Sequence, residues 1–489
     1  MIVHKFGGTS LGNADRIDAV TGIIAASQKN SPTVVVVSAI SGTTDRLIAA
    51  ARAAATGDDV TSQEALVWLA QAHHAVVNTL LGESAEGGTL HSTIDKQLSR
   101  LERFLESFSV LGELTARGHD AVAGFGELLS ASIVAAVLHR RGVKAEPISS
   151  TELIVTDDHF GSASPQMPAT RKQIGERIRP LVDEGVIPII TGYIGATEDG
   201  VPTTLGRSGS DYSAAVIAAC LGATELRIWT DVDGILTADP NVVPDARVLR
   251  ELSYEEATRL ARFGAEVLHP RTIGPIIQYG IPLRILNSFN PRDAGTRIVE
   301  SPASERQLRP AIISATGLQL IRLRSRNGPW MLRSATEALA QLESAGIAVQ
   351  MFSQSFSEQG MNLVVSEQDA EHSARLLSAS NVVPDISHLG SYVLDGTEKV
   401  ATVSVIGLPC DRRAGIASRA FASLGKHGVR VVAVTQAASE DSVTFCIPDA
   451  DVAETVRLLH RDLGLSNEDG DERSVVVRHA SQRDAVETL

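Results

Sequence analysis

The 489-residue chain is poor in cysteine and has no surplus of basic residues. Its cysteines, Cys220, Cys410 and Cys446, are far apart and have neither metal-binding nor disulfide spacing, which indicates reduced thiols in a cytosolic protein. The net charge of −14 argues against a nucleic-acid or anionic-membrane partner, because both require a basic surface. Any site for a polyanion must therefore be a local cluster of cations.

Long apolar runs and an N-terminal targeting pattern are also missing. No run reaches the ~18 apolar residues that a membrane span needs, and no basic region precedes an apolar stretch at the N-terminus, so we expect no signal peptide. The composition, with 43% hydrophobic and 21% charged residues, is ordinary for a globular protein. We therefore expect a cytoplasmic protein of two to four domains that does not interact with a membrane.

Strands and helices alternate over residues 1–300, which predicts a layered α/β domain with a mainly parallel central sheet. Continuous apolar runs such as Val34–Val37 and Leu226–Thr230 are typical of strands buried on both faces of a parallel sheet. Helical stretches such as Gly126–Arg141 lie between them. The region 62–117 has helical periodicity and few turn signals, and we expect it to be a helical insertion.

Two later segments, 318–365 and 400–447, share one plan and form an internal repeat. Each has a strand, a glycine-containing loop, an amphipathic helix and two further strands, with the pattern Gln-x-x-Ser-Glu between the last two. We place the two repeat domains at 310–395 and 396–466, and we expect their sheets to pair around a symmetric interface. The acidic tail at 467–489 completes the chain.

The first strand ends in the sequence KFGGTS, which has the chemical outline of a phosphate cradle. Gly7 and Gly8 leave backbone N–H groups open to an anion, Lys5 places a cation beside them, and Thr9 and Ser10 follow. The motif is not a Walker A loop, because the lysine precedes the glycines. The alternative is a tight turn without a ligand.

Two further loops of small residues lead into helices. The sequence SAISGTTD, with Ser38 and Thr44, could hold a negative group at a helix N-terminus. The sequence TTLGRSGSDYSAA brings Arg207, Ser210 and Asp211 to another helix start, where the guanidinium could grip a carboxylate. The alternative is that Ser210 or Asp211 only caps the helix.

Acidic residues occupy two more positions of interest. Glu127 opens an apolar helix in FGELLSA, and Asp231 follows Thr230 at the end of a strand in WTDVDG. Such carboxylates could bind a ligand ammonium, a Mg²⁺ ion or a ribose. They could equally compensate a helix dipole or form turns within the backbone.

The order of KFGGTS, SAISGTTD, FGELLSA, TTLGRSGSDYSAA, TDVDG and FGAEVLHPRTI resembles the aspartate kinases of the amino-acid kinase superfamily. The resemblance covers nearly the whole chain, and the repeats resemble the family's paired, ferredoxin-like ACT domains. It implies MgATP-dependent phosphorylation of the aspartate β-carboxylate to 4-phospho-L-aspartate, the entry step to lysine, threonine and methionine. It also implies a homodimer or larger assembly formed through the ACT domains.

The resemblance further implies a role for each matching residue. Lys5 contacts the transferring phosphoryl group and Asp211 organises the active site. The residues that match aspartate contacts are Thr44, Glu127, Arg207 and Ser210. Those that match the ATP site are Lys5, Gly7, Gly8, Thr9, Ser10, Ser38, Thr230 and Asp231.

The same comparison points to an amino-acid effector. Gln354 and Gln436 recur at the same place in the two repeats and match the glutamines that contact threonine in threonine-sensitive relatives. Threonine is therefore the first choice and lysine the second. The alternative is that each glutamine only ends a strand.

Three positions depart from the family pattern, namely Leu236, Asn241 and Glu266. In the family, tyrosine, arginine and lysine are common at these positions, which match the nucleotide side. The changes therefore remove two cations and add one anion there, so we expect weaker ATP binding unless Arg271 or another basic residue compensates. Two other hypotheses stay open: a catalytically weakened amino-acid sensor, and a kinase for a related carboxylate such as glutamate. Without a strand–GxGxxG–helix unit, we expect no homoserine dehydrogenase domain.

Overall fold

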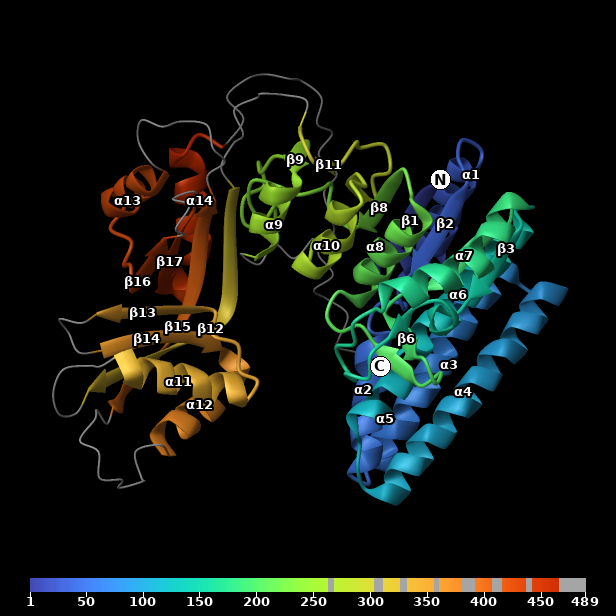
Figure 1. Ribbon diagram of the computed structural model, residues 1–489, viewed down its shortest axis with the longest axis horizontal. Helices are drawn as coiled ribbons and strands as arrows, with labels where there is room; N and C mark the ends of the chain where they lie inside the picture. The colour runs from blue at the N-terminus through green and yellow to red at the C-terminus, as the bar shows by residue number, and fades with distance from the viewer. Residues whose placement is uncertain are drawn as a thin grey trace, which may run out of the picture.

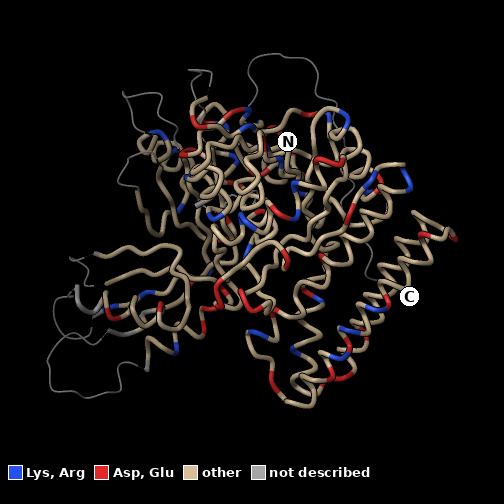
Figure 2. Tube along the Cα trace, turned by 45° about the vertical axis from the view of Figure 1, so that its right-hand side comes forward, with Lys and Arg blue, Asp and Glu red and all other residues tan. Residues whose placement is uncertain are grey.

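The chain forms two parts, each built on its own large sheet, in a computed structural model (Figure 1). Acidic and basic residues are interspersed along both parts (Figure 2). The structure describes residues 1–262, 268–302, 311–325, 332–355, 360–379, 392–406, 416–436 and 442–465.

The first part contains an eight-stranded sheet in the order β3-β5-β2-β1-β8-β10-β11-β9. Strand β1 runs parallel to both β2 and β8, while β11 is antiparallel to β10. The predicted, mainly parallel sheet is thus confirmed. The strands are β1 (Ile2–Phe6), β2 (Thr33–Val37), β3 (Ala145–Ile148), β5 (Ile187–Thr191), β8 (Glu225–Thr230), β9 (Glu251–Ser253), β10 (Leu283–Asn287) and β11 (Thr296–Val299).

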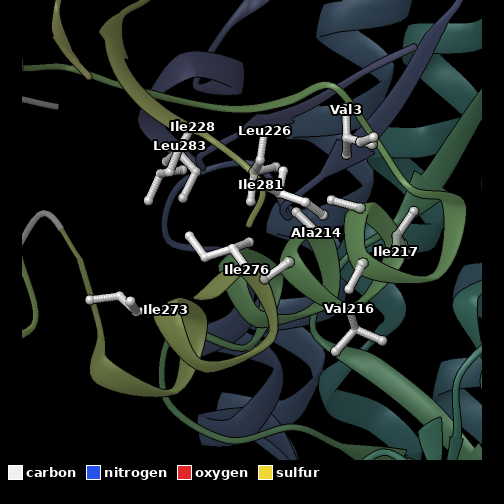
Figure 3. Close-up of a cluster of buried hydrophobic side chains, with 14 of the residues drawn as sticks. Val3, Ala214, Val216, Ile217, Leu226, Ile228, Ile273, Ile276, Ile281 and Leu283 are labelled. Carbon is white, nitrogen blue, oxygen red and sulfur yellow. The ribbon is translucent and has the colours of Figure 1, made fainter. Parts of the chain in front are cut away.

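Helices cover both faces of this sheet, and β2 shows why its sequence is continuously apolar. Val34 and Val36 face one hydrophobic core, whereas Val35 and Val37 face the other. Figure 3 shows the first core, where Ala214 and neighbouring helix residues meet the strands. The helices packed around the sheet are α1 (Ala14–Gln28), α6 (Phe125–Arg140), α7 (Met167–Asp183), α8 (Gly209–Leu221), α9 (Tyr254–Arg262) and α10 (Pro270–Gln278).

The expected insertion is helical and packs beneath α6. The predicted stretch 62–117 falls on α3 (Asp59–Leu81), α4 (Ala85–Leu111) and the start of α5 (Ala116–Ala123). Helix α2 (Thr43–Ala55) precedes it and packs against α3 and α4. Side chains of Asp58 and Ser84 cap the N-termini of α3 and α4. Within the described residues, one helical stretch, 116–140, is long and apolar enough to cross a membrane, and 78% of its most apolar window is buried in the protein core.

A three-stranded sheet of β4 (Val155–Thr156), β6 (Ile194–Thr197) and β7 (Pro202–Thr204) flanks the main sheet. Buried Asp120 of α5 ties this small sheet to the loop that precedes α7. Its carboxylate accepts hydrogen bonds from the backbone N–H groups of Gly161 and Thr204, each at 2.8 Å, and from the Thr204 hydroxyl. The carboxylate therefore fixes the strand that leads into the loop before α8.

The second part contains a six-stranded sheet in the order β13-β14-β12-β15-β17-β16. Each repeat contributes a strand, a helix and two further strands in that order along the chain, as predicted. Strands β12 and β15 each have 15 residues and serve both repeats. The start of β12 pairs with the end of β15, and its later residues pair with β14 and the start of β15. The elements are β12 (Ala311–Ser325), α11 (Leu332–Ser344), β13 (Met351–Ser355), β14 (Gly360–Ser366), α12 (Glu367–Ala379), β15 (Tyr392–Ile406), α13 (Ile416–Lys426), β16 (Ala433–Gln436), β17 (Ser442–Pro448) and α14 (Val452–Asp462).

Because two strands are shared, the first repeat is inserted into the fold of the second. The division at 310–395 and 396–466 stays a prediction, since the opening residues of β12 lie against the second repeat. The edge strands β13 and β16 lie beside each other. The acidic tail lies outside the described residues.

The two parts meet where the segment after β8 packs on the second repeat. The Thr237 hydroxyl is 3.0 Å from His460 Nε2 of α14, and the Ile312 N–H of β12 donates to the Thr237 carbonyl. The Arg457 guanidinium donates to the Val242 carbonyl at 3.0 Å. The segment leading away from β8 is therefore bound directly to the second repeat.

Candidate active site

A cavity of about 490 Å³ opens at the carboxyl ends of β1, β2, β5 and β8. Ligands of open parallel sheets bind outside the carboxyl ends of the strands. Most of the predicted site residues line it, namely Lys5, Gly7, Gly8, Thr9, Ser38, Thr44, Glu127, Ser210, Asp211, Thr230 and Asp231.

Lys5 reaches into the cavity from β1 and forms an ion pair with Asp211. The Lys5 Nζ is 2.6 Å from Asp211 Oδ1, and both side chains are largely buried. Gly7 lies beside the same ammonium group, because a Cβ at Gly7 would stand 3.5 Å from Lys5 Nζ. The ion pair with Asp211 of α8 therefore holds the ammonium in position.

The N-termini of α2 and α8 both border the cavity, and neither has a side-chain cap. The residues at their N-cap positions, Gly42 and Ser208, have left-handed backbone with φ of 78° and 55°. Uncapped N–H groups and the positive end of the helix dipole favour an anionic ligand. The cavity thus offers backbone donors on two sides.

Glu127 lies in the first turn of α6 and is 3% exposed. Burial raises the pKa of its carboxyl to about 8, while backbone hydrogen bonds and the Lys5 ammonium oppose the rise. Its Oε2 has no hydrogen-bond partner among the described residues. A ligand cation placed at this oxygen would satisfy it and favour the charged carboxylate.

The absence of a side chain at Gly126 lets the FGELLSA helix lie close against the SAISGTTD loop. A Cβ at Gly126 would stand 2.5 Å from the Ala39 Cβ and 2.8 Å from Thr43 Cγ2. Only glycine permits this close approach of α6 to the loop after β2. The approach brings Glu127 and Thr44 to the wall of one cavity.

Two of the residues predicted for the kinase site do not line the cavity. Ser10 is fully buried, and its hydroxyl bonds with Ser288 at 2.7 Å and donates to the Trp229 carbonyl. Its hydroxyl therefore holds the loop after β1 in place. Arg207 is exposed and stands outside the cavity wall, although its neighbours Ser208 and Ser210 are part of it.

Two of the three departures from the family pattern lie away from the cavity. Leu236 pairs with Val248, and Asn241 is an exposed residue of the segment that packs on the second repeat. Neither lines the cavity, and Glu266 lies outside the described residues. The Arg271 guanidinium donates to the Leu205 carbonyl at 2.9 Å, so it supports the loop before Arg207.

The sequence analysis missed Tyr193, Ser208 and Asp45 as cavity residues. Tyr193 follows β5 with a left-handed φ of 70°, and its N–H donates to Ser213 Oγ of α8. Burial raises the pKa of the Tyr193 hydroxyl. Its place directly after a continuous apolar strand was a usable signal, because such ends border ligand sites.

Four carboxyl groups, of Asp45, Glu127, Asp211 and Asp231, line the cavity against one ammonium, that of Lys5. A triphosphate would need a further cation there, so the donor set suits Mg²⁺ carried in with the nucleotide. The described residues contain no group of three or more His, Cys, Asp or Glu that could hold a metal on its own.

The two glutamines predicted to bind an effector lie on the edge strands. Gln354 is in β13, and its Nε2 is buried without a partner among the described residues. Gln436 ends β16 and is exposed. The two positions therefore differ in their surroundings.

Residues 1–287 match the amino acid kinase family and residues 403–463 match the ACT domain. The chain thus combines an amino acid kinase domain with an ACT domain, the class that the sheet topology and cavity define. Aspartokinase 3 (chloroplastic) of Arabidopsis thaliana is 32% identical over 475 residues, which are 94% of this chain and 80% of that protein. The chain belongs to the aspartokinases, within the amino acid kinase family.

A bifunctional aspartokinase/homoserine dehydrogenase of Haemophilus influenzae is 30% identical and matches 95% of this chain. The chain spans about half the length of such bifunctional relatives. E. coli aspartokinase III in complex with aspartate and ADP (R-state) superposes with a TM-score of 0.78 and 28% identity, over 95% of this chain and 99% of that chain. The complex of that enzyme with lysine and aspartate (T-state) superposes with a TM-score of 0.77.

Proposed function

We propose that the chain is an aspartate kinase that transfers the γ-phosphoryl group of MgATP to the β-carboxylate of L-aspartate. The observation that carries the proposal is a cavity that combines the Lys5–Asp211 ion pair with a buried, unpartnered Glu127 carboxyl. The ion pair, through the Lys5 ammonium, suits a phosphate group, and the Glu127 carboxyl suits an amino group. Aspartokinases at about 30% identity support the same activity.

In this proposal, Lys5 and the uncapped N-termini of α2 and α8 stabilise the charge of the transferring phosphoryl group. Gly7, Gly8 and Thr9 line the phosphate side, with Ser38, Thr230 and Asp231 nearby. Mg²⁺ bound with the nucleotide would supply the second cation that the carboxylate-rich cavity lacks.

The acceptor side needs no strong general base, because the attacking β-carboxylate is ionised at neutral pH. Glu127 would receive the substrate ammonium, while Thr44 and Ser210 would contact its carboxylates. Asp211 would hold Lys5 in place and remain a carboxylate throughout. The chemistry then rests on alignment and charge neutralisation.

A coupled assay of ADP release tests the activity, with aspartate, glutamate and several nucleoside triphosphates compared on the purified full chain. We expect turnover with aspartate and ATP and little with glutamate. Faster turnover with glutamate would identify a different carboxylate kinase. Binding of aspartate without turnover under any nucleotide would favour an amino-acid sensor.

Arg207→Ala should raise the KM for aspartate much more than the KM for ATP. A lost carboxylate contact weakens binding by about 1.5–3 kcal/mol, or roughly 10- to 150-fold. The exposed position of Arg207 beside the cavity makes this a strict test, because the loop at residues 205–209 would have to bring it to the substrate. If both KM values stayed unchanged, Arg207 would have no role in substrate binding.

We also propose that the ACT repeats form a homodimer and bind an amino-acid effector, with threonine favoured over lysine. Strands β13 and β16 are the edges of the six-stranded sheet, and their side chains Phe352 and Val434 are 49% and 40% exposed. An exposed sheet edge can pair with a strand of another chain. The buried and unpartnered Gln354 amide supports a polar ligand at β13. We further propose that the protein is cytoplasmic and acts in the synthesis of lysine and threonine.

Gln354→Ala combined with Gln436→Ala should abolish inhibition by threonine and leave kinase activity without effector unchanged. An effector acts only through its different affinity for two arrangements, typically worth about 1–3 kcal/mol. Titrations of wild type and the double variant with threonine and lysine measure this. Inhibition that survives in the double variant, or wild type that responds to neither amino acid, would leave the repeats without this sensor role.

A further inference from the structure

The α3–α4 hairpin of the helical insertion carries a pair of histidines for which the kinase activity has no use. His74 lies on α3 and His91 on α4, and their Nδ1 atoms face each other across the hairpin. The ring centroids are 4.6 Å apart and the planes are tilted by 33°. The two rings therefore converge on one point between the helices.

The outer nitrogen of each ring is held by an oxygen from the opposite helix. His74 Nε2 lies 2.8 Å from Asp95 Oδ1, and His91 Nε2 lies 2.9 Å from Asn78 Oδ1. Asn78 stands four residues after His74, and Asp95 four after His91, so each pair shares a helix face. The four side chains form a crossed, nearly symmetric arrangement.

The partners of the two outer nitrogens indicate where the ring protons lie in this arrangement. A carboxylate oxygen and an amide carbonyl oxygen accept hydrogen bonds, so each Nε2 is the donor. In a neutral imidazole the other nitrogen then carries a lone pair. The two Nδ1 lone pairs consequently point at each other, and only a cation between them makes the contact favourable.

We propose that the facing Nδ1 atoms of His74 and His91 form a binding site for a transition-metal ion of the zinc or copper class. Imidazole nitrogen is a preferred ligand of these ions. Metal-bound histidines usually donate their second ring nitrogen to a carboxylate or carbonyl oxygen, as Asp95 and Asn78 allow here.

The ion would have two protein ligands and water in its remaining positions. With metal–nitrogen distances of about 2.0–2.1 Å, the rings would move apart to roughly 3.3 Å between the Nδ1 atoms in a tetrahedral site. The His74 side chain is 25% exposed, which gives the ion access from solvent. Because α3 and α4 are adjacent in sequence, the bound ion would link the two arms of the hairpin.

The test uses the purified full chain, stripped of metal with a chelator and titrated with zinc chloride at constant pH. Bound zinc and the midpoint of thermal unfolding are measured for wild type, His74→Gln, His91→Gln and Asp95→Asn. His139→Gln, which changes an exposed histidine at the end of α6, is the matched control. Kinase activity and far-UV circular dichroism establish that each variant is folded.

We expect wild type and His139→Gln to bind one zinc ion that His74→Gln and His91→Gln do not bind. Asp95→Asn should weaken the site by about 10- to 100-fold, the usual effect of losing an outer-sphere partner. Saturating zinc should raise the unfolding midpoint of wild type, since a ligand of the native state stabilises it. Equal zinc binding by wild type and the His74 variant, or no rise in the wild-type midpoint, would overturn the site and indicate that the rings share only a proton.

Discussion

Lys5→Ala is expected to lower kcat by roughly 10²–10³-fold while leaving the fold intact. The side chain places a cation, held 2.6 Å from Asp211, beside the Gly7–Gly8 loop where charge develops on the transferring phosphoryl group. Preorganised charges of this kind act mainly in the transition state, so kcat should fall more than the KM values rise. Steady-state kinetics on wild type and variant measure the effect.

A surface lysine supplies the control for this variant. Lys172→Ala removes an equal charge from an exposed position on α7 and should leave kcat unchanged. Far-UV circular dichroism and the thermal midpoint must agree among the three proteins. A folded Lys5→Ala enzyme with near-normal kcat would show that the ammonium takes no part in phosphoryl transfer.

Glu127→Gln is expected to weaken aspartate binding by roughly 10- to 150-fold, because a charged hydrogen bond worth about 1.5–3 kcal/mol is lost. In wild type, burial sets the pKa of this carboxyl at about 8, so it is mostly protonated at pH 7 before substrate arrives. A substrate ammonium favours the carboxylate and expels the proton. Calorimetry in two buffers of different ionisation enthalpy should record nearly one proton released, and none for the variant.

The same pKa predicts a change in stability with pH. The folded value of about 8 exceeds the ordinary value of 4.5, so the native state binds the extra proton between these limits. The stabilisation is therefore fully present below pH 4.5 and is lost as pH rises through 8, by at most on the order of 5 kcal/mol. Glu127→Gln should remove this loss, whereas Glu184→Gln at the exposed end of α7 should not. Identical pH profiles of unfolding for wild type and Glu127→Gln would contradict the burial of an unpaired carboxyl.

Local pattern was sufficient for the parallel sheet and for most of the cavity. A strand buried on both faces must be continuously apolar, and Val34–Val37 is such a run. Loops that follow such strands gather at one edge of the sheet, which is why KFGGTS, SAISGTTD and TDVDG meet in space. These inferences need only the direction of each strand.

Side-chain direction inside a loop was beyond the sequence. Ser10 and Thr9 are adjacent, yet Thr9 lines the cavity and Ser10 turns inward to Ser288, a residue 278 positions away. Tyr193 enters the site because its backbone is left-handed, a conformation that no propensity of tyrosine predicts. Both outcomes depend on packing between distant segments.

For a related reason, the sequence did not predict that two long strands of the second part are shared by both repeats. The repeat was evident from its spacing, but pairing between strands about 70 to 95 residues apart leaves no periodic signal in either strand. The contact of Thr237 with His460 likewise joins residues 223 positions apart. Leu236 and Asn241 belong to the same segment, and neither lines the cavity.

The most direct test of the account is to trap the product. The full chain is incubated with MgATP and L-aspartate in the presence of hydroxylamine, which converts an acyl phosphate to a hydroxamate, and the product is identified by mass spectrometry and NMR. The account predicts aspartate β-hydroxamate, formed in proportion to ADP and absent with Lys5→Ala. Formation of ADP without hydroxamate, or a hydroxamate at the α-carboxylate, would contradict it.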